Sequence, residues 1–273
     1  MFDLLICMRC HDYLPLILDT ARSVKYYTGV DTSRLIFAVD CNPLLAAQLE
    51  KRFPGQVYCS GVKYGWGAGL YTLLVESLLW AEERWKFEHF LSIDYDTLFV
   101  GEDVDIGLLE HIESEQVGMV GHYRGGHPHW ANVYKREKGI LEKSFGHIPR
   151  AYLPGEGVQG GCMLLTRMFI EALRERRFLA MPLREVKKYT GIADDHLLPL
   201  LMRVCRLSPM SATDMLLSEW NLSRDPRGLE KEGIKVFHPT KCFARHAGSE
   251  LEVHVRTYFA ERQKETAPFV FGK

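Results

Sequence analysis

The stretch that decides the fold is residues 90–100, FLSIDYDTLFV, in which an apolar run meets two aspartates and then becomes apolar again. The apolar run is typical of a buried strand with acids at its end. Because side chains alternate across a strand, Asp94 and Asp96 are expected to point to one side and Tyr95 to the other. Two carboxylates this close repel each other, and burying them is costly unless a proton or a cation lies between them. The stretch therefore predicts a divalent-cation site; the alternative is that the acids only turn the chain after the strand.

Length and composition are those of an ordinary globular protein. The chain has 273 residues, 47% of them apolar and 25% charged, enough for one sizeable α/β domain. Its net charge of -1 gives no overall attraction to nucleic acid or to an anionic membrane, although the basic run at 174–188 leaves a local basic helix face. No apolar stretch is long enough to span a bilayer, and the first residues lack signal-peptide features, so we expect a cytoplasmic protein.

The seven cysteines are scattered and odd in number, which fits reduced thiols better than a disulfide framework. Residues 7–11, CMRCH, match the pattern of covalent haem attachment and, in part, of a redox dithiol. Haem attachment normally requires export, and Cys7 falls inside an apolar run. We therefore interpret Cys7 as a cysteine of a core strand.

Apolar segments alternate with helical patterns along the first hundred residues. Strands are expected at 4–8, 35–39 and 56–59 and before Asp94, with helices from about 12 to 24, at 43–52 and at 68–83. This order predicts an α/β fold with a mostly parallel sheet and helices on both faces. Ligands of such sheets bind outside the carboxyl ends of the strands. The residues at those ends are Arg9, Cys10, Asp40, the segment 63–69, Asp94 and Asp96.

A nucleotide-binding half that ends in an apolar strand and Asp-x-Asp resembles the GT-A glycosyltransferases, which have a Rossmann-like fold and use a nucleoside diphosphate sugar with a divalent metal. The resemblance implies a single domain, with 1–103 as the nucleotide-sugar-binding half and 104–273 as the acceptor-binding and catalytic half. It implies that Asp40 contacts the base or ribose and that the turn 63–69, KYGWGAG, approaches the nucleotide. The donor-binding residues that we expect from this half are Arg9, Asp40, Lys63, Trp66, Asp94 and Tyr95.

Two segments of the second half extend the resemblance. Residues 156–165, EGVQGGCMLL, are expected to form a loop followed by a buried strand, and the resemblance places Gly160 and Gly161 beside the donor sugar. Residues 191–200 open a helix with Asp194 and Asp195 in its first turn. A helix cap is the plain alternative. The resemblance makes this pair the acidic motif of inverting enzymes, with Asp195 favoured over Asp194 as the base.

The resemblance also reaches the strand at 234–238. His238 is similar to the C-terminal metal ligand of several GT-A families, and Lys241 to their diphosphate-binding lysine. The expected metal is Mn²⁺ or Mg²⁺, held by Asp94, Asp96 and His238, with imidazole favouring Mn²⁺. A UDP-sugar is the favoured donor.

Residues 121–152 are rich in histidine, aromatic residues and glycine and are expected to form a long loop at the acceptor site. Tyr123, Trp130 and Tyr152 are candidates for stacking on a sugar or a base. The acceptor itself stays open among a glycan, a small molecule, a protein and nucleic acid.

Three alternatives stay open, and a fourth, a nucleotidyltransferase, is disfavoured. A retaining enzyme would need no base. A nucleotidyltransferase would have a glycine-rich loop after the first strand, and residues 7–13 contain no glycine. A non-catalytic nucleotide-sugar-binding protein would keep the pocket without needing Asp195. An enzyme acting on a modified nucleic-acid base would show salt-dependent DNA binding.

Overall fold

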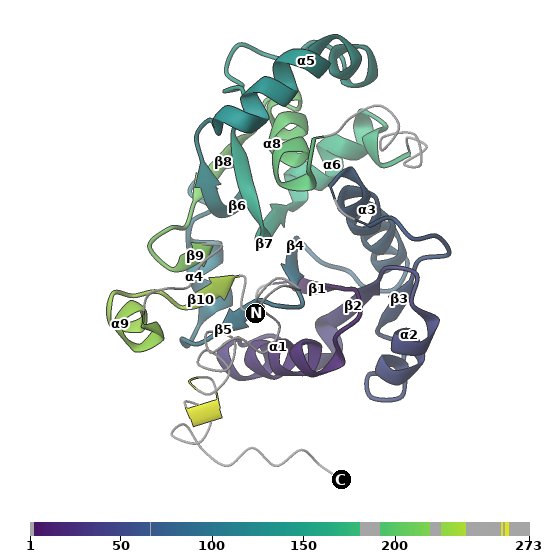
Figure 1. The fold of residues 1–273 in the computed structure, drawn as a ribbon, viewed down its shortest axis with the longest axis vertical. Coiled ribbons are helices and arrows are strands. Elements are labelled where there is room, and N and C mark those ends of the chain that lie inside the picture. The colour runs from purple at the N-terminus through teal and green to yellow at the C-terminus, as the bar shows by residue number, and fades with distance from the viewer. Residues whose placement is uncertain are drawn as a thin grey trace.

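The computed structural model describes residues 3–65, 67–180, 192–218, 225–238, 258, 260 and 261. Its centre is a seven-stranded sheet with the strand order β3-β2-β1-β4-β7-β6-β8 (Figure 1). Neighbouring strands run parallel except at β7, which is antiparallel to both β4 and β6. The strands of this sheet are β1 (Leu4–Cys10), β2 (Leu35–Val39), β3 (Val57–Cys59), β4 (His89–Asp94), β6 (Val117–Arg124), β7 (Gly157–Thr166) and β8 (Ser208–Ser211). The mostly parallel α/β sheet predicted from the sequence is confirmed.

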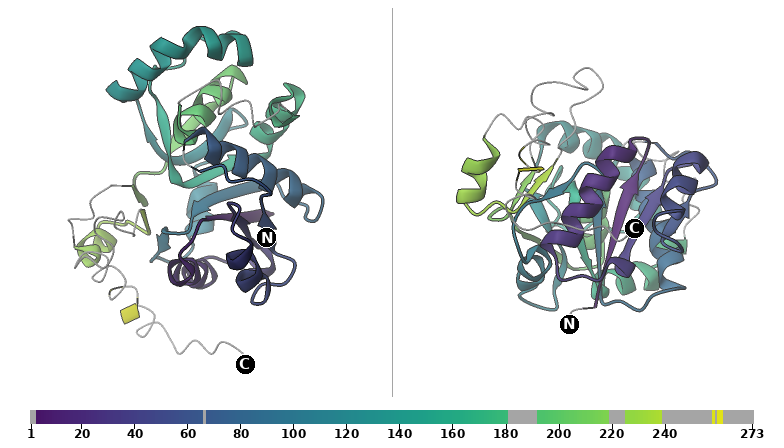
Figure 2. Two further views of the ribbon diagram at one scale, coloured as in Figure 1. Left: turned by 45° about the vertical axis from the view of Figure 1, so that its right-hand side comes forward. Right: turned by 90° about the horizontal axis from the view of Figure 1, so that it is seen from below.

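Helices cover both faces of the sheet, because the central strands are apolar on both sides. In β1 every residue is buried, with Ile6 and Met8 in one core and Leu5 and Cys7 in the other. Helix α1 packs on one face of the sheet and helix α3 on the other (Figure 2). The helices are α1 (Leu14–Tyr27), α2 (Pro43–Glu50), α3 (Ala68–Glu82), α4 (Val104–Glu110), α5 (Pro128–Phe145), α6 (Arg167–Glu175), α8 (Asp194–Val204) and α9 (Pro226–Lys231), with single 3₁₀ turns at Thr32–Arg34 and Phe178–Ala180.

A second, three-stranded sheet lies next to the end of β4. It consists of β5 (Leu98–Phe99), β10 (Val236–His238) and β9 (Leu216–Ser218), with β10 in the middle. Val236 pairs antiparallel with Phe99, which follows the aspartate turn by three residues. This pairing carries the last residue of β10, His238, back to the aspartates although some 140 positions separate them in the sequence.

Two expectations for the second half were wrong. Residues 121–152 do not form a long loop: they contain the end of β6 and the helix α5. The helix is amphipathic, has Pro128 in its first turn, and ends at Phe145; the capping residue Gly146 has a φ of 85°, which suits glycine. The strand β7 already begins at Gly157, so Gly160 and Gly161 lie within the strand and not in a loop before it.

Cys7 lies fully buried in β1, as expected for a core cysteine. The six cysteines within the described residues are all free thiols. Among the helices described here, none is both long enough and apolar enough to cross a membrane.

Candidate functional site

The turn after β4 is fixed on three sides. The backbone N–H of Tyr95 donates to the carbonyl of Arg9 in β1 (3.2 Å), and that of Thr97 donates to the carbonyl of Asp94 (3.0 Å). From α1, the buried hydroxyl of Thr20 lies 2.7 Å from the carbonyl oxygens of both Tyr95 and Thr97. The Thr97 hydroxyl in turn donates to the carbonyl of Gly161 in β7 (2.6 Å). The turn therefore holds its acids in one fixed position at the carboxyl end of the parallel strands.

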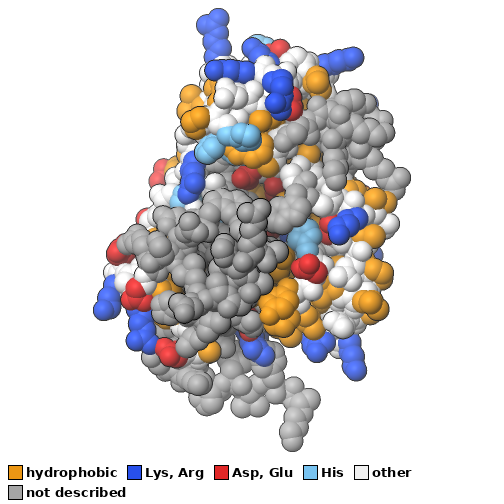
Figure 3. Space-filling view, in the orientation of Figure 1, with side chains coloured by type: hydrophobic (Ala, Val, Ile, Leu, Met, Phe, Trp, Pro, Cys, Tyr) orange, Lys and Arg blue, Asp and Glu red, His pale blue; other side chains and the backbone are white. Residues whose placement is uncertain are grey.

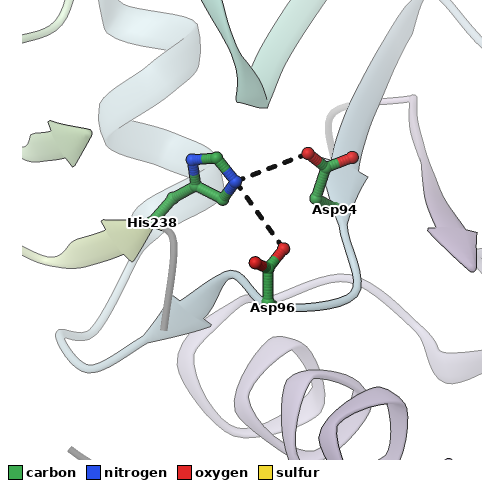
Figure 4. A group of neighbouring side chains, drawn as sticks. All are labelled: Asp94, Asp96 and His238. Carbon is green, nitrogen blue, oxygen red and sulfur yellow. Dashed lines mark ion pairs between the residues drawn. The ribbon is translucent and has the colours of Figure 1, made fainter. Parts of the chain in front are cut away.

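Asp94, Asp96 and His238 converge beyond this turn (Figure 4). His238 Nε2 lies 3.4 Å from Asp94 Oδ2 and 3.6 Å from Asp96 Oδ1. One ligand atom from each residue lies within 4.8 Å of the others. Adjacent ligands of a six-coordinate cation are about 3 Å apart, so these separations fit a cation between the three groups. Two carboxylate oxygens and one imidazole nitrogen form a donor set that suits Mn²⁺. Figure 3 shows acidic side chains at the bottom of a hollow on this face of the molecule.

The imidazole of His238 is oriented by its other nitrogen. Ser218 in β9 lies with its hydroxyl 3.3 Å from His238 Nδ1 and 3.3 Å from the side-chain carbonyl oxygen of Gln159. If the hydroxyl donates to Gln159, it accepts from Nδ1–H, which leaves the Nε2 lone pair facing the carboxylates. A Cβ atom on Gly161 would overlap the imidazole, so glycine at this position in β7 makes room for the ring.

Arg9, which we expected to bind the donor, is fully buried beneath the aspartates. Its Nη2 lies 2.8 Å from Asp94 Oδ1 and also donates to the carbonyl of Gly160, while Nη1 donates to Asp194 Oδ2. Burial alone would lower the pKa of Arg9, but the adjacent Asp94 and Asp194 hold it above its ordinary value. Asp94 thus uses one oxygen for Arg9 and turns the other toward His238.

Asp194 and Asp195 begin α8, as predicted, but they differ in environment. The N-cap position is held by Ala193, so neither aspartate caps the helix. Asp194 is buried against Arg9; burial raises its pKa, and Arg9 opposes that rise. The Asp195 side chain is 22% exposed, and burial together with the neighbouring Asp194 raises its pKa to about 7. Within the described part of the chain, Asp195 Oδ1 accepts no hydrogen bond.

The expected nucleotide-binding residues lie around the carboxyl ends of β1 and β2. Asp40 is buried and accepts hydrogen bonds from the backbone N–H groups of Tyr64 (2.7 Å) and Gly65 (2.9 Å), so it shapes the turn that contains the exposed Lys63. Tyr95 is buried on the α1 side, with the ring of His11 edge-on at 5.9 Å. Trp66 and Lys241 lie outside the described residues.

The aromatic residues expected at the acceptor site have three different positions. Trp130, in the first turn of α5, packs on the ring of His196 at 4.7 Å between centroids. Tyr123 donates to Glu156 (2.8 Å). Tyr152 is buried in the core against Tyr134, so the prediction that it stacks on a sugar or a base is wrong.

His196 was not predicted and lies next to Asp195. Its Nε2 is 3.8 Å from Asp195 Oδ1, and its Nδ1 is 2.9 Å from the carbonyl oxygen of Glu156. Burial lowers the pKa of His196 to about 4, so the imidazole is neutral at physiological pH. Thr20 and Ser218 were also missed, because a single hydroxyl residue carries no spacing signal in the sequence. His196 follows Asp195 directly, and that adjacency was the one available signal.

No protein-family model matches the sequence, and no curated protein matches it significantly. Among solved structures, the chain is similar to the mannosyltransferase PcManGT from Pyrobaculum calidifontis in complex with GDP-Man and Mn²⁺, with a TM-score of 0.48 and 12% identity. That similarity covers 96% of this chain and 64% of PcManGT, so this chain spans less than two thirds of that protein.

Two further structures are similar over most of their length. The galactosyltransferase LgtC in complex with donor and acceptor sugar analogues has a TM-score of 0.48 and 12% identity, over 97% of both chains. The mouse xyloside xylosyltransferase 1 has a TM-score of 0.45 and 12% identity, over 87% of this chain and 98% of that one.

Proposed function

We propose that this chain is a metal-dependent glycosyltransferase that moves a sugar from a nucleoside diphosphate sugar to an acceptor hydroxyl with inversion. The observation that carries the proposal is the convergence of Asp94 Oδ2, Asp96 Oδ1 and His238 Nε2 at the carboxyl end of a parallel sheet. Ligands of such sheets bind outside that end. The order of motifs that resembles the GT-A enzymes supports the same activity.

The three converging residues would hold Mn²⁺ or Mg²⁺, which supplies positive charge to a leaving diphosphate. Asp195 is the proposed base. Its side chain is partly exposed, and its pKa of about 7 suits a group that takes a proton near neutral pH. Asp194 is unsuited to that role because Arg9 occupies its Oδ2.

The donor would lie along the first half of the chain, 1–103, and the acceptor against the second half, 104–273. Asp40, Lys63, Trp66 and Lys241 remain the proposed donor-side residues, with a UDP-sugar as the favoured donor. Trp130 and His196 form an aromatic wall beside Asp195, which suits an acceptor that presents the C–H face of a sugar ring. The free cysteine thiols support a reducing compartment such as the cytoplasm.

Release of nucleoside diphosphate tests the proposal. The purified protein is incubated with a panel of UDP- and GDP-sugars and candidate acceptors, with and without Mn²⁺, beside Asp96→Asn and Asp105→Asn. Asp105 is a matched control, because its carboxylate is also buried but accepts from the Gly29 backbone away from the triad. We expect release from one donor that requires metal, is lost in Asp96→Asn and is retained in Asp105→Asn. Metal-independent donor binding in all three proteins would contradict the proposal.

The stereochemistry is tested on the same reaction. Proton NMR of the first product formed reports whether the anomeric configuration is inverted. We expect inversion, and Asp195→Asn should remove transfer while donor binding is retained. A product with retained configuration would overturn the role of Asp195 as the base and leave metal-dependent transfer intact.

A further inference from the structure

Arg9 is the largest side chain that is fully buried in the described part of the chain. A buried guanidinium is costly, and apolar residues of similar volume often replace buried ion pairs without loss of stability. Its neighbours in β1, Met8 and Cys10, are apolar and belong to the core. A cation at this position therefore calls for an explanation other than stability.

The contacts of Arg9 join parts of the molecule that the chain itself does not connect. Nη2 binds Asp94 at the end of β4 and the carbonyl of Gly160 in β7, and Nη1 binds Asp194 in the first turn of α8. Asp94 belongs to the metal triad, and Asp194 immediately precedes the proposed base. One planar group thus contacts both sides of the site, an arrangement that the rigid fork of arginine allows and the single ammonium of lysine does not.

We propose that Arg9 is a positioning residue that couples the metal ligand Asp94 to the helix that carries the base Asp195, and this inference rests on the proposed function. Arg9 holds Oδ1 of Asp94, so that Oδ2 alone faces His238 and the cation. It holds Asp194 Oδ2, which fixes the first turn of α8 and keeps Asp194 from competing with Asp195 as the base. Gly160 leaves the space for this contact, since a Cβ there would lie 3.2 Å from Arg9 Nη2.

If Arg9 couples the two sides of the site, substitutions outside the triad should change the affinity for the metal. Loss of an outer partner of a metal ligand typically weakens metal binding by about 10–100-fold. We expect a loss of that size in Arg9→Lys and a smaller loss in Asp194→Asn, which leaves Arg9 with one anionic partner fewer. Above the pKa of about 7 of Asp195, Asp195→Asn removes the same charge from the same turn, and among the described residues Asp195 has no hydrogen bond or ion pair to Arg9. It should therefore change Mn²⁺ affinity less than Asp194→Asn does.

The measurement is Mn²⁺ binding without substrate, followed by the EPR signal of free Mn²⁺. Arg34→Lys is the matched control. Arg34 also holds backbone at β1, donating to the carbonyls of Leu4 (2.9 Å) and Lys86 (2.7 Å), but at the opposite end of the strand. Its Mn²⁺ affinity should equal that of the native protein. Circular dichroism confirms that each variant is folded, and Asp194→Asn carries the test if Arg9→Lys does not fold.

A double-mutant cycle distinguishes coupling through Arg9 from a simple sum of charges. If Arg9 transmits the effect, Asp194→Asn should have no further effect on Mn²⁺ affinity in the Arg9→Lys background. Native affinity in Arg9→Lys, or equal effects of Asp194→Asn and Asp195→Asn, would overturn the inference while the proposed function stands. Failure of the native protein to bind Mn²⁺ and also Mg²⁺ would overturn both.

Discussion

The imidazole of His238 rests directly against the backbone of Gly161, with no room between them for a methyl group. Gly161 lies in β7 of the central sheet, and His238 ends β10 of the small sheet. Glycine inside a strand usually weakens it, and it often marks a place where another group approaches closely. Here the close approach sets the position of the only imidazole in the proposed metal triad.

Gly161→Ala should therefore weaken metal binding by displacing His238. We expect Mn²⁺ affinity to fall by at least about 10-fold, the scale seen when the support of a metal ligand is lost. Titration calorimetry with Mn²⁺ measures the change. Gly139→Ala is the control, because a Cβ at Gly139 in α5 would meet nothing within 4 Å. That variant should keep the native affinity and gain some stability. Equal affinities in both variants would show that His238 is not a ligand.

The aspartate turn and its setting could be predicted because their signals are local. Apolar runs that end in a polar residue predicted the parallel strands; Asp94 is the last residue of β4, and Asp96 follows it by two positions. The acids of α8 were found for the same reason, because they open an apolar helical pattern.

The contacts that complete the site depend on positions far apart in the sequence. Arg9 meets Asp194 across 185 residues, and Ser218 meets His238 only because β9 and β10 pair. Residues 121–152 were misassigned because histidine and glycine obscured the pattern of α5, whose apolar positions pack on a partner that no local pattern reveals.

The rate of transfer should depend on the protonation of Asp195. A base must be unprotonated, so kcat/KM should rise with pH through about 7, the raised pKa of Asp195. Asp194→Asn removes the negative neighbour that helps to raise this pKa, so its rising limb should move to lower pH. A pH profile of nucleoside diphosphate release at saturating Mn²⁺ tests both expectations. An unchanged limb in Asp194→Asn would assign the titration to another group.

The same aspartate should reduce stability at high pH. Its folded pKa lies above the value of about 3.9 in an unfolded chain, so the folded state binds the proton more tightly. The contribution of Asp195 to stability is therefore fully present below about pH 4 and is lost as pH rises through about 7. Asp195→Asn should be more stable than the native protein by about 4 kcal/mol at pH 8, and the two should converge near pH 4. Urea unfolding at the two pH values measures this difference, and a constant difference at both would refute it.

Trp130 should act on the acceptor and not on the donor. Trp130 packs on His196, whose Nε2 lies 3.8 Å from Asp195 Oδ1. Among the described residues, no ring contact joins Trp130 to a residue of the metal triad. Replacing a stacking aromatic removes about 1–3 kcal/mol of binding where a flat ligand packs on it, by analogy with stacked bases. In Trp130→Ala we expect KM for the acceptor that supports the fastest transfer to rise by about 5-fold or more. Donor hydrolysis without acceptor, measured on the same sample, should keep its native rate and metal dependence. A fall in hydrolysis with an unchanged acceptor KM would place Trp130 on the donor side of Asp195.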